Sequence, residues 1–260
     1  MTGKTPYIVI VPVADVLEIP AQADIILRRE SQLLLGEIFN VEARAGFYFK
    51  GTCQHDGYPG FVHINQITPA TGKATHFCDN KISIIHSGPD IKARGVMTIP
   101  QMARLKIEKD SLKNGFLKVG ELGWIPAEHV QPLPSLRQRV DYVSHALTLQ
   151  GTPYRYGGRS TLGMDCSGLV QTALTRSGFS KIPRDADMQE RSSRLGQKID
   201  PATVQRGDIV FFPQHVGIML NREDIISATE KFSAVVIETL DEMVKRQGAI
   251  TSVRRPALLP

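Results

Sequence analysis

Cys166 is the residue with the clearest setting for chemistry. It lies at the predicted first turn of a helix, within the segment Asp165–Gly168. Unpaired backbone N–H groups and the positive end of the helix dipole favour a thiolate there, so we expect the pKa of this thiol to fall below the usual value of about 8.5. A lone cysteine is otherwise most often a small buried hydrophobic residue. Gly157 and Gly158 favour the reactive interpretation, because glycines allow close backbone approach.

A thiolate nucleophile needs a proton partner, and His215 is the best candidate among seven histidines. It begins the apolar segment 215–219 directly after Pro213 and Gln214, so its ring can face a cleft while the strand behind it is buried. The alternative is a histidine at a strand end without a chemical role. A cysteine paired with a histidine would carry out acyl transfer.

Five motifs in order between Gly151 and Ile218 resemble the NlpC-type cell-wall cysteine peptidase family, a circularly permuted relative of the papain fold. The motifs are residues 151–158, 165–168, 183–185 with Gln189, 206–212 and 215–218. The resemblance implies that Cys166 attacks the substrate carbonyl and that His215 orients the thiolate and protonates the leaving amine. It also places the backbone N–H of Cys166 in the oxyanion hole. No cofactor and no metal are implied.

The amino-terminal half resembles bacterial SH3 domains. The matching segments are 13–16, 29–33, 36–37 and 56–62 in a first module, and 89–92 and 123–129 in a second. Two such modules before a peptidase domain are typical of the γ-D-glutamyl-L-diamino acid endopeptidase branch of the family. The resemblance covers nearly the whole chain. It implies hydrolysis of the bond after γ-D-Glu in murein peptides that have a free amino-terminal L-Ala.

The same resemblance implies a set of substrate-binding residues. Asp165 is expected to bind the free α-amine of L-Ala, while Ser167 and Arg184 hold the α-carboxylate of D-Glu. Tyr58 would close the subsite and so require a free amino terminus. A carboxylate beside a cysteine would raise the thiol pKa, and a plain helix cap is the alternative role for Asp165. The remaining predicted substrate-binding residues are Asp185 and Tyr154.

Ser227 departs from the family pattern. In the family a third polar residue, usually histidine, hydrogen-bonds the base and fixes its tautomer. Alignment of residues 224–229 with the corresponding strand places Ser227 at this catalytic position, and Ala186 stands where many relatives carry serine. A serine should orient His215 less firmly, so we expect reduced activity. A catalytically impaired homologue that still binds murein peptides is therefore an open alternative.

Two other functions remain open on the sequence. One is a binding module in which the SH3 domains hold peptidoglycan and the carboxy-terminal domain is passive. The other is an acyltransferase or amidase, because the same cysteine and histidine serve any acyl transfer.

Two kinds of structure must position these residues. Short apolar runs separated by turn signals fill residues 7 to 133, as in small antiparallel barrels, and the recurrence of 60–62 as 123–125 indicates tandem barrels. We expect domains at residues 1–72, 73–133 and 134–260. The last has two helices followed by an antiparallel sheet, an α+β arrangement. Ser135 should cap its first helix, its second helix should follow Asp165, and its strands are expected at 208–212, 215–219, 224–226 and 234–237.

Composition excludes several functions. The net charge of +5 is scattered among acidic residues, so no nucleic-acid partner is expected, and no apolar run is long enough for a membrane span. Cys53, Cys78 and Cys166 are widely spaced without a C-x-x-C pair, so neither a metal site nor a disulfide is expected, which fits a reducing compartment. The apolar run at 7–11 is interrupted by Pro12 and lacks a cleavage site, so we expect a cytoplasmic protein. The expected partner is a murein tripeptide, and oligomeric state is not predicted.

Overall fold

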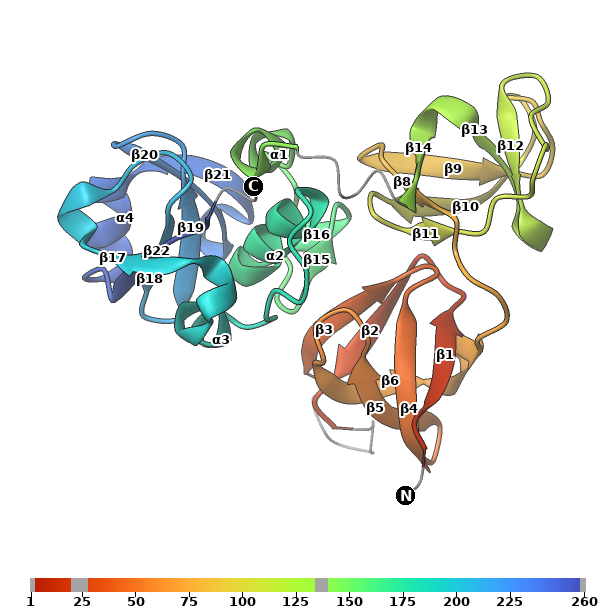
Figure 1. Cartoon of the computed structure of the whole chain (residues 1–260), viewed down its shortest axis with the longest axis horizontal. Coiled ribbons are helices and arrows are strands. Elements are labelled where there is room, and N and C mark those ends of the chain that lie inside the picture. Colours follow the sequence, from red (N-terminus) through yellow and green to blue (C-terminus); the bar gives the residue numbers. More distant parts are fainter. Residues whose placement is uncertain (1–2, 20–27, 134–139, 258–260) are drawn as a thin grey trace. The chain divides into compact units, whose positions relative to one another are not determined.

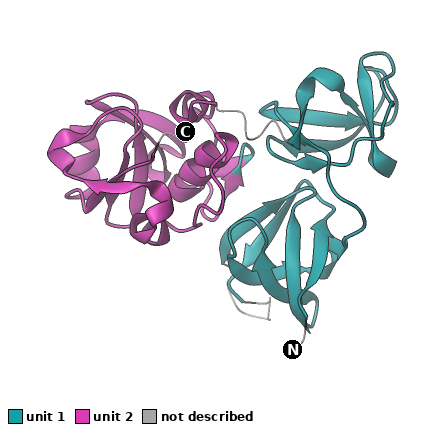
Figure 2. Cartoon of the chain, in the orientation of Figure 1, with its two compact units in different colours: residues 1–136, 160–162 teal, residues 137–159, 163–260 magenta. Residues whose placement is uncertain are grey.

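The computed structural model describes residues 3–19, 28–133 and 140–257 (Figure 1). These residues form two compact units (Figure 2). Unit 1 comprises residues 1–136 with 160–162, and unit 2 comprises residues 137–159 with 163–260. Within the described residues, every helix is too short or too polar to span a lipid bilayer. Mixed α and β structure, as predicted, is confirmed.

The first sheet of unit 1 has the strand order β3-β2-β6-β5-β4-β1-β7, with antiparallel neighbours. In strands such as β4, alternate side chains point to one face, so Phe39 and Val41 are buried while Glu42 and Arg44 are exposed. A closed barrel, expected from the sequence, is not found among the paired strands that the structure describes. The strands are β1 (Thr5–Val9), β2 (Val13–Leu17), β3 (Arg29–Leu34), β4 (Ile38–Ala45), β5 (Tyr48–Cys53), β6 (Pro59–His63) and β7 (Ile67–Pro69).

The rest of unit 1 consists of a four-stranded sheet, β10-β9-β13-β12, and a three-stranded sheet, β11-β8-β14. Their core contains Ile85, Ile99, Leu105 and Ile125, together with Leu35 from the β3–β4 connection. The strands are β8 (His76–Cys78), β9 (Ile82–His86), β10 (Gly95–Pro100), β11 (Arg104–Leu105), β12 (Phe116–Val119), β13 (Gly123–Pro126) and β14 (Val130–Pro132).

Unit 2 is built on a six-stranded antiparallel sheet with the order β17-β22-β18-β19-β20-β21. Its strands are β17 (Gln197–Ile199), β18 (Ile209–Phe212), β19 (His215–Met219), β20 (Asp224–Thr229), β21 (Ala234–Thr239) and β22 (Ser252–Arg255). The helices are α1 (Tyr142–Thr148), α2 (Cys166–Arg176), α3 (Ala186–Arg191) and α4 (Leu240–Gln247), and a short hairpin is formed by β15 (Arg159–Ser160) and β16 (Gly163–Met164). The four strands predicted for this part of the chain are present as β18 to β21.

Helix α1 begins later than the sequence indicates. Ser135 and Leu136 lie outside the described residues, and the helix starts at Tyr142 with Asp141 as its N-cap. The carboxylate of Asp141 accepts hydrogen bonds from the backbone N–H groups of Val143 and Ser144 at 3.3 and 3.1 Å. The first backbone N–H groups of a helix have no partner within the helix, and Asp141 satisfies two of them in α1. Ser135 was predicted from the sequence to have this capping role.

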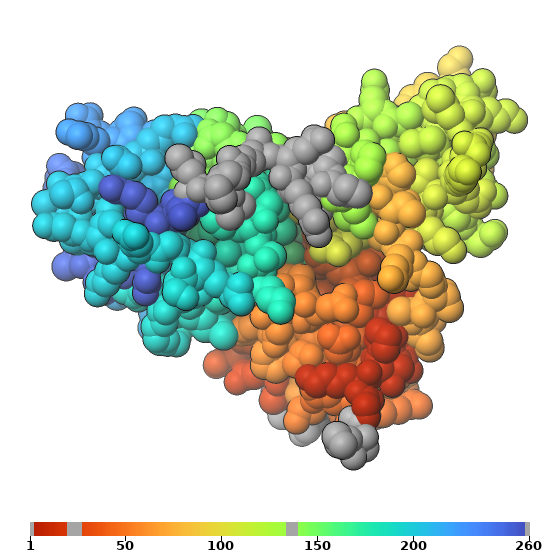
Figure 3. Space-filling view, viewed as in Figure 1, coloured from red at the N-terminus to blue at the C-terminus, as the bar shows by residue number. Residues whose placement is uncertain are grey.

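Both faces of the central strands β18, β19 and β20 are covered, which explains why they are apolar at almost every position. On one face Phe211, Val216 and Ile226 belong to the core that contains α1 and α2. On the other face Phe212 and Met219 pack with Met243 of α4. Side chains fill the spaces between the ribbons in each unit (Figure 3). The sheet is thus a rigid support for residues at the strand ends.

Candidate active site

Cys166 is the first residue of α2, and the local backbone accounts for its position. The carboxylate of Asp165, the N-cap, accepts a hydrogen bond from the backbone N–H of Gly168 at 2.8 Å. Gly168 lies against the carbonyl oxygen of Gly158, and an added Cβ would be only 2.1 Å from that oxygen. Only glycine allows this approach of the preceding loop to the helix start, where Cys166 is 8% exposed.

The sulfur of Cys166 lies against the strand that carries His215. The backbone N–H groups of Val216 and Ser167 hydrogen-bond the sulfur. Since Val216 directly follows His215 at the start of β19, α2 brings the thiol to the end of the strand where the histidine stands. The helix also packs along β19 and β20.

Burial raises the pKa of the Cys166 thiol to about 12, and the negative charge of Asp165 acts in the same direction. The two backbone N–H groups and the Arg184 guanidinium oppose this rise without reversing it. The sequence-based expectation of a lowered pKa is therefore wrong. The helix-start donors are present as predicted, but withdrawal from water and an adjacent carboxylate outweigh them.

His215 is buried and contacts Ser227 of β20. Its Nε2 lies 3.1 Å from the Ser227 Oγ, so the structure brings these two predicted residues together. The pKa of His215 is lowered to about 4, mainly by burial and then by the positive charge of Arg246, whereas Asp165 opposes the shift. The imidazole is therefore neutral at neutral pH and able to accept a proton.

The contact with Ser227 bears on which ring nitrogen can act as a base. If Nε2 carries the proton and donates it to the Ser227 hydroxyl oxygen, Nδ1 is left as the acceptor. The opposite tautomer would place a proton on Nδ1 and remove its basicity. A serine can either donate or accept, so it selects the tautomer less strongly than an acceptor without a proton would.

Asp165 is held in a buried network rather than left open. Its Oδ1 accepts from Arg184 Nη1 at 3.0 Å and its Oδ2 from Arg184 Nη2 at 2.7 Å. It also accepts from the backbone N–H groups of Gly168 and Gly157, each at 2.8 Å, and from the Ser167 hydroxyl at 3.3 Å. These five donors fill the roughly four acceptor sites of a carboxylate. The helix-cap alternative therefore describes its position.

Arg184 and Ser167 belong to the same network. The Arg184 guanidinium, 1% exposed, also donates to the Ser167 hydroxyl at 2.8 Å and to the Gly158 carbonyl at 3.2 Å. Burial alone would lower the pKa of Arg184, but Asp165 raises it above its ordinary value, so the guanidinium stays charged. The ion pair joins the loop before α2, the start of α2 and the segment before α3.

The other predicted substrate residues are placed as follows. Tyr154 is half-buried beside the nucleophile: burial raises its pKa, and the charges of Cys166 and Asp165 add to the rise. Asp185 is half-buried at the N-cap position of α3. Tyr58 belongs to unit 1, where it packs against the core of the first sheet.

Two residues near the site, Gln189 and Arg246, were not predicted as site residues from the sequence. Gln189 of α3 is fully buried, and its amide donates to the carbonyl oxygens of Ser167 and Pro183, each at 2.9 Å. Arg246 of α4 acts electrostatically on His215. Gln189 stood in one of the motifs, so a signal existed for it. Arg246 lies on a helix that the sequence analysis did not predict, and no motif marks it.

The chain is similar to known proteins over most of its length. The sequence pattern of the NlpC/P60 family matches residues 151–254. The chain is 30% identical over 227 residues to dipeptidyl-peptidase 6 of Lysinibacillus sphaericus, covering 81% of each chain. It is 28% identical over 255 residues to a gamma-D-glutamyl-L-lysine dipeptidyl-peptidase of Bacillus subtilis, covering 87% of this chain and 80% of that protein.

A solved structure has the same fold. The crystal structure of an NlpC/P60 family protein from Bacillus cereus superposes with a TM-score of 0.80 at 20% identity, over 97% of this chain and 99% of that one. The sequence match over most of the chain, taken with this fold, shows that the chain belongs to the NlpC/P60 family.

Proposed function

We propose that this protein is a cysteine endopeptidase that hydrolyses the γ-D-glutamyl-L-diamino acid bond of murein peptides with a free amino-terminal L-Ala. The geometry at the end of β19 supports this chemistry. The Cys166 sulfur lies against the backbone of β19, the strand that begins with His215, and the Nε2 of His215 contacts Ser227. The name of the Bacillus subtilis relative, a gamma-D-glutamyl-L-lysine dipeptidyl-peptidase, supports the γ-D-glutamyl bond as the target, and the name of the Lysinibacillus sphaericus relative, dipeptidyl-peptidase 6, supports peptidase activity.

In this proposal the reaction begins from a neutral pair. With the thiol pKa at about 12 and the His215 pKa at about 4, both groups are uncharged at neutral pH. His215 Nδ1 takes the thiol proton as the sulfur attacks the carbonyl carbon, and the resulting imidazolium gives that proton to the leaving amine. The backbone N–H of Cys166 stabilises the oxyanion. Water then hydrolyses the thioester and regenerates the thiol.

Asp165, Ser167 and Arg184 already hydrogen-bond one another, and this network limits how they can bind a substrate. An incoming α-amine or α-carboxylate must replace one of the hydrogen bonds within it, or bind through its electric field. We propose that Asp165 attracts the L-Ala amine in this way, with Tyr154 and Asp185 lining the site and Tyr58 closing the subsite. The proximity of Tyr154 to Cys166 supports its part in this proposal.

We also propose that unit 1 contains two SH3-like modules, at residues 1–72 and 73–133, before a peptidase domain at 134–260. Two cores support this division: one contains Val16, Phe39 and Val62, and the other contains Ile85 and Ile125 with Leu35 contributed by the first module.

The decisive experiment is incubation of the purified protein with L-Ala-γ-D-Glu-diaminopimelate and mass spectrometry of the products. We expect release of the free diamino acid by the wild type and none by Cys166→Ala. The same tripeptide with an acetylated amino terminus is the matched control and should not be cleaved. Release by Cys166→Ala, or equal cleavage of the acetylated peptide, would contradict the proposal.

A second candidate function is a murein-peptide-binding protein with little catalytic activity. The serine at position 227 and the raised thiol pKa favour it, since the serine orients the base less firmly and the raised pKa lowers the fraction of thiolate. Calorimetry with the same tripeptide separates the two: saturable binding without release of product by the wild type supports the binding protein.

A further inference from the structure

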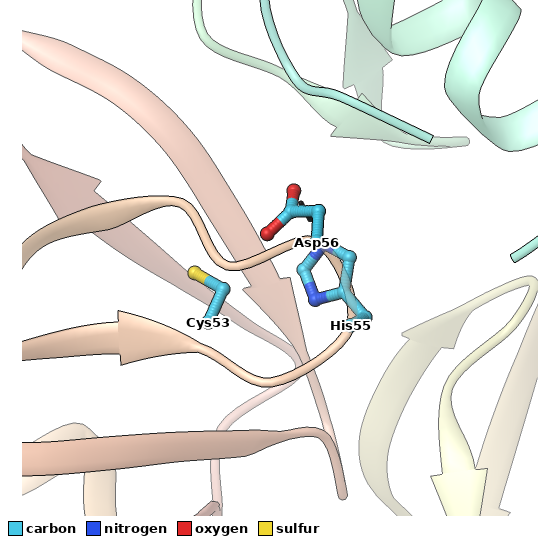
Figure 4. A group of neighbouring side chains, drawn as sticks. All are labelled: Cys53, His55 and Asp56. Atoms are coloured by element: carbon cyan, nitrogen blue, oxygen red, sulfur yellow. Dashed lines mark ion pairs between the residues drawn. The ribbon is translucent and has the colours of Figure 1, made fainter. Parts of the chain in front are cut away.

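Three metal-ligating side chains in unit 1 come together at the turn between β5 and β6 (Figure 4). The thiol of Cys53 ends β5, and the imidazole of His55 and the carboxylate of Asp56 follow in the turn. One potential ligand atom from each residue lies within 4.8 Å of the other two. This group belongs to unit 1, whereas the proposed catalytic residues belong to unit 2.

Backbone hydrogen bonds hold the turn in this conformation. The N–H of Gly57 donates to the carbonyl of Cys53, and the N–H of Cys53 donates to the carbonyl of Tyr58, each at 2.8 Å. Gly57 has a φ of +83°, which favours glycine, and Asp56 Oδ1 accepts from the N–H of Tyr58 at 2.9 Å. The three ligand atoms are therefore placed by a preformed turn.

The imidazole of His55 lies beside two carboxylates, those of Asp56 and Glu37. Its Nε2 lies 2.9 Å from Asp56 Oδ2, and its Nδ1 lies 4.0 Å from Oε2 of Glu37. The side chains of these two acids are only 1% and 5% exposed. Both ring nitrogens are buried, yet among the described residues neither makes an aligned hydrogen bond. Buried polar nitrogens normally have such a partner. A cation at this point would bind a ring nitrogen of His55 beside the carboxylate of Asp56.

We propose that Cys53, His55 and Asp56 bind a Zn²⁺ ion. Thiolate, imidazole and carboxylate are all zinc ligands, whereas Mg²⁺ and Ca²⁺ select oxygen atoms. Bonds of about 2.0 to 2.3 Å in a tetrahedral site hold the ligand atoms roughly 3.3 to 3.8 Å apart. A separation at the 4.8 Å limit would have to shorten by about 1 Å, and the 2.9 Å contact must lengthen slightly. Side-chain rotations provide movements of this size.

The ion would have a structural role. Its three ligands come from four consecutive positions, and Glu37 of the β3–β4 connection, or a water molecule, would complete the tetrahedron. Binding would join the β5–β6 turn to the β3–β4 connection and fix the backbone that leads into Tyr58. The absence of a C-x-x-C pair led the sequence analysis to expect no metal. The site becomes visible only when the turn brings unlike ligands together.

The test uses the full-length, untagged protein with Cys166→Ala, which removes the thiol nearest His215. After treatment with a chelator, the protein is titrated with Zn²⁺ against a chromogenic indicator and, separately, with Co²⁺ monitored by absorption. We expect one equivalent of Zn²⁺ and a thiolate-to-cobalt charge-transfer band. His55→Gln and Cys53→Ser should weaken binding by at least about tenfold, since even residues outside the ligand shell change metal affinity roughly 10- to 100-fold. Cys78→Ser, a buried thiol of the second module, is the matched control and should bind as the parent does.

Thermal unfolding keeps the proposal testable if a variant is less stable. Zn²⁺ should raise the Tm of the parent and of Cys78→Ser but not that of His55→Gln. Failure of the parent to bind Zn²⁺ at micromolar concentration would overturn the proposal. Equal affinity in the parent and in His55→Gln would also overturn it, and would leave the His55–Asp56 contact as an ordinary ion pair.

Discussion

Replacing Ser227 by alanine tests the arrangement of the proposed catalytic residues most directly. The Ser227 side chain is fully buried and its Oγ lies 3.1 Å from His215 Nε2. Removing it leaves a buried ring N–H without this acceptor, which costs about 1 to 3 kcal/mol. If that cost falls entirely on the transition state, where the imidazole becomes charged, kcat decreases by roughly 5- to 150-fold, since about 1.4 kcal/mol corresponds to a factor of ten. KM should change little, because Ser227 contacts the base and is fully buried, so a substrate would not reach it.

The assay is release of the diamino acid from the murein tripeptide, measured as kcat and KM at neutral pH. Ser177→Ala is the matched control: it removes another buried hydroxyl hydrogen bond, to the Ala173 carbonyl, at the opposite end of α2. The control should keep its kcat while losing a similar amount of stability. A Ser227→Ala kcat within about twofold of the wild type would fall below the expected range and refute the assignment of Ser227 as the residue that orients His215.

Three further predictions concern the charges around the nucleophile. Asp165→Asn leaves a buried guanidinium without its ion pair and should cost about 3 to 5 kcal/mol of unfolding free energy in denaturant titrations, whereas Asp141→Asn, in an exposed pair, should cost about 1 kcal/mol or less. Because the pKa of His215 is lowered in the folded protein, this histidine takes up a proton between about pH 6.5 and 4 only in the unfolded chain. The free energy of unfolding should therefore fall by roughly 3 kcal/mol as the pH falls through that window. His215→Gln should remove this dependence, which urea melts at several pH values would measure. The rate of alkylation of Cys166 by iodoacetamide should be low at neutral pH and increase about tenfold per pH unit up to pH 10, because only the thiolate reacts and the thiol pKa is high. A rate that does not depend on pH above 7 would contradict the raised pKa.

A gain of activity is expected from Ser227→His. A histidine at this position would hold the His215 tautomer more firmly than a rotatable hydroxyl does. The site is fully buried, so the larger ring also costs packing energy of about 1 to 3 kcal/mol. We expect a higher kcat in a variant whose Tm shows that it is folded. An unchanged or lower kcat in a folded variant would show that the serine is already sufficient.

Sequence patterns predicted the parts of the structure that depend on local chemistry. The strands at β18 to β21 and the helix that begins at Cys166 follow from apolar runs, a cap and flanking glycines, and they are found where expected. Helix α4 was not predicted, because of its eight residues only Met243 is buried and so it lacks a long apolar face. Closure of the amino-terminal strands into barrels was expected from a repeat, but a repeat specifies strands and not which edges pair.

The sequence by itself determined the identity and order of the chemical groups: a cysteine at a helix start, a histidine at a strand start and a serine on the next strand. Only the tertiary structure decided their electrostatics, because a pKa depends on burial and on charges brought from distant segments. The helix-start donors of Cys166 could be predicted from its neighbours, but the burial that raises its pKa to about 12 could not. Likewise Arg246, which lies 31 residues after His215 in the sequence, acts on the imidazole only because α4 packs against the sheet.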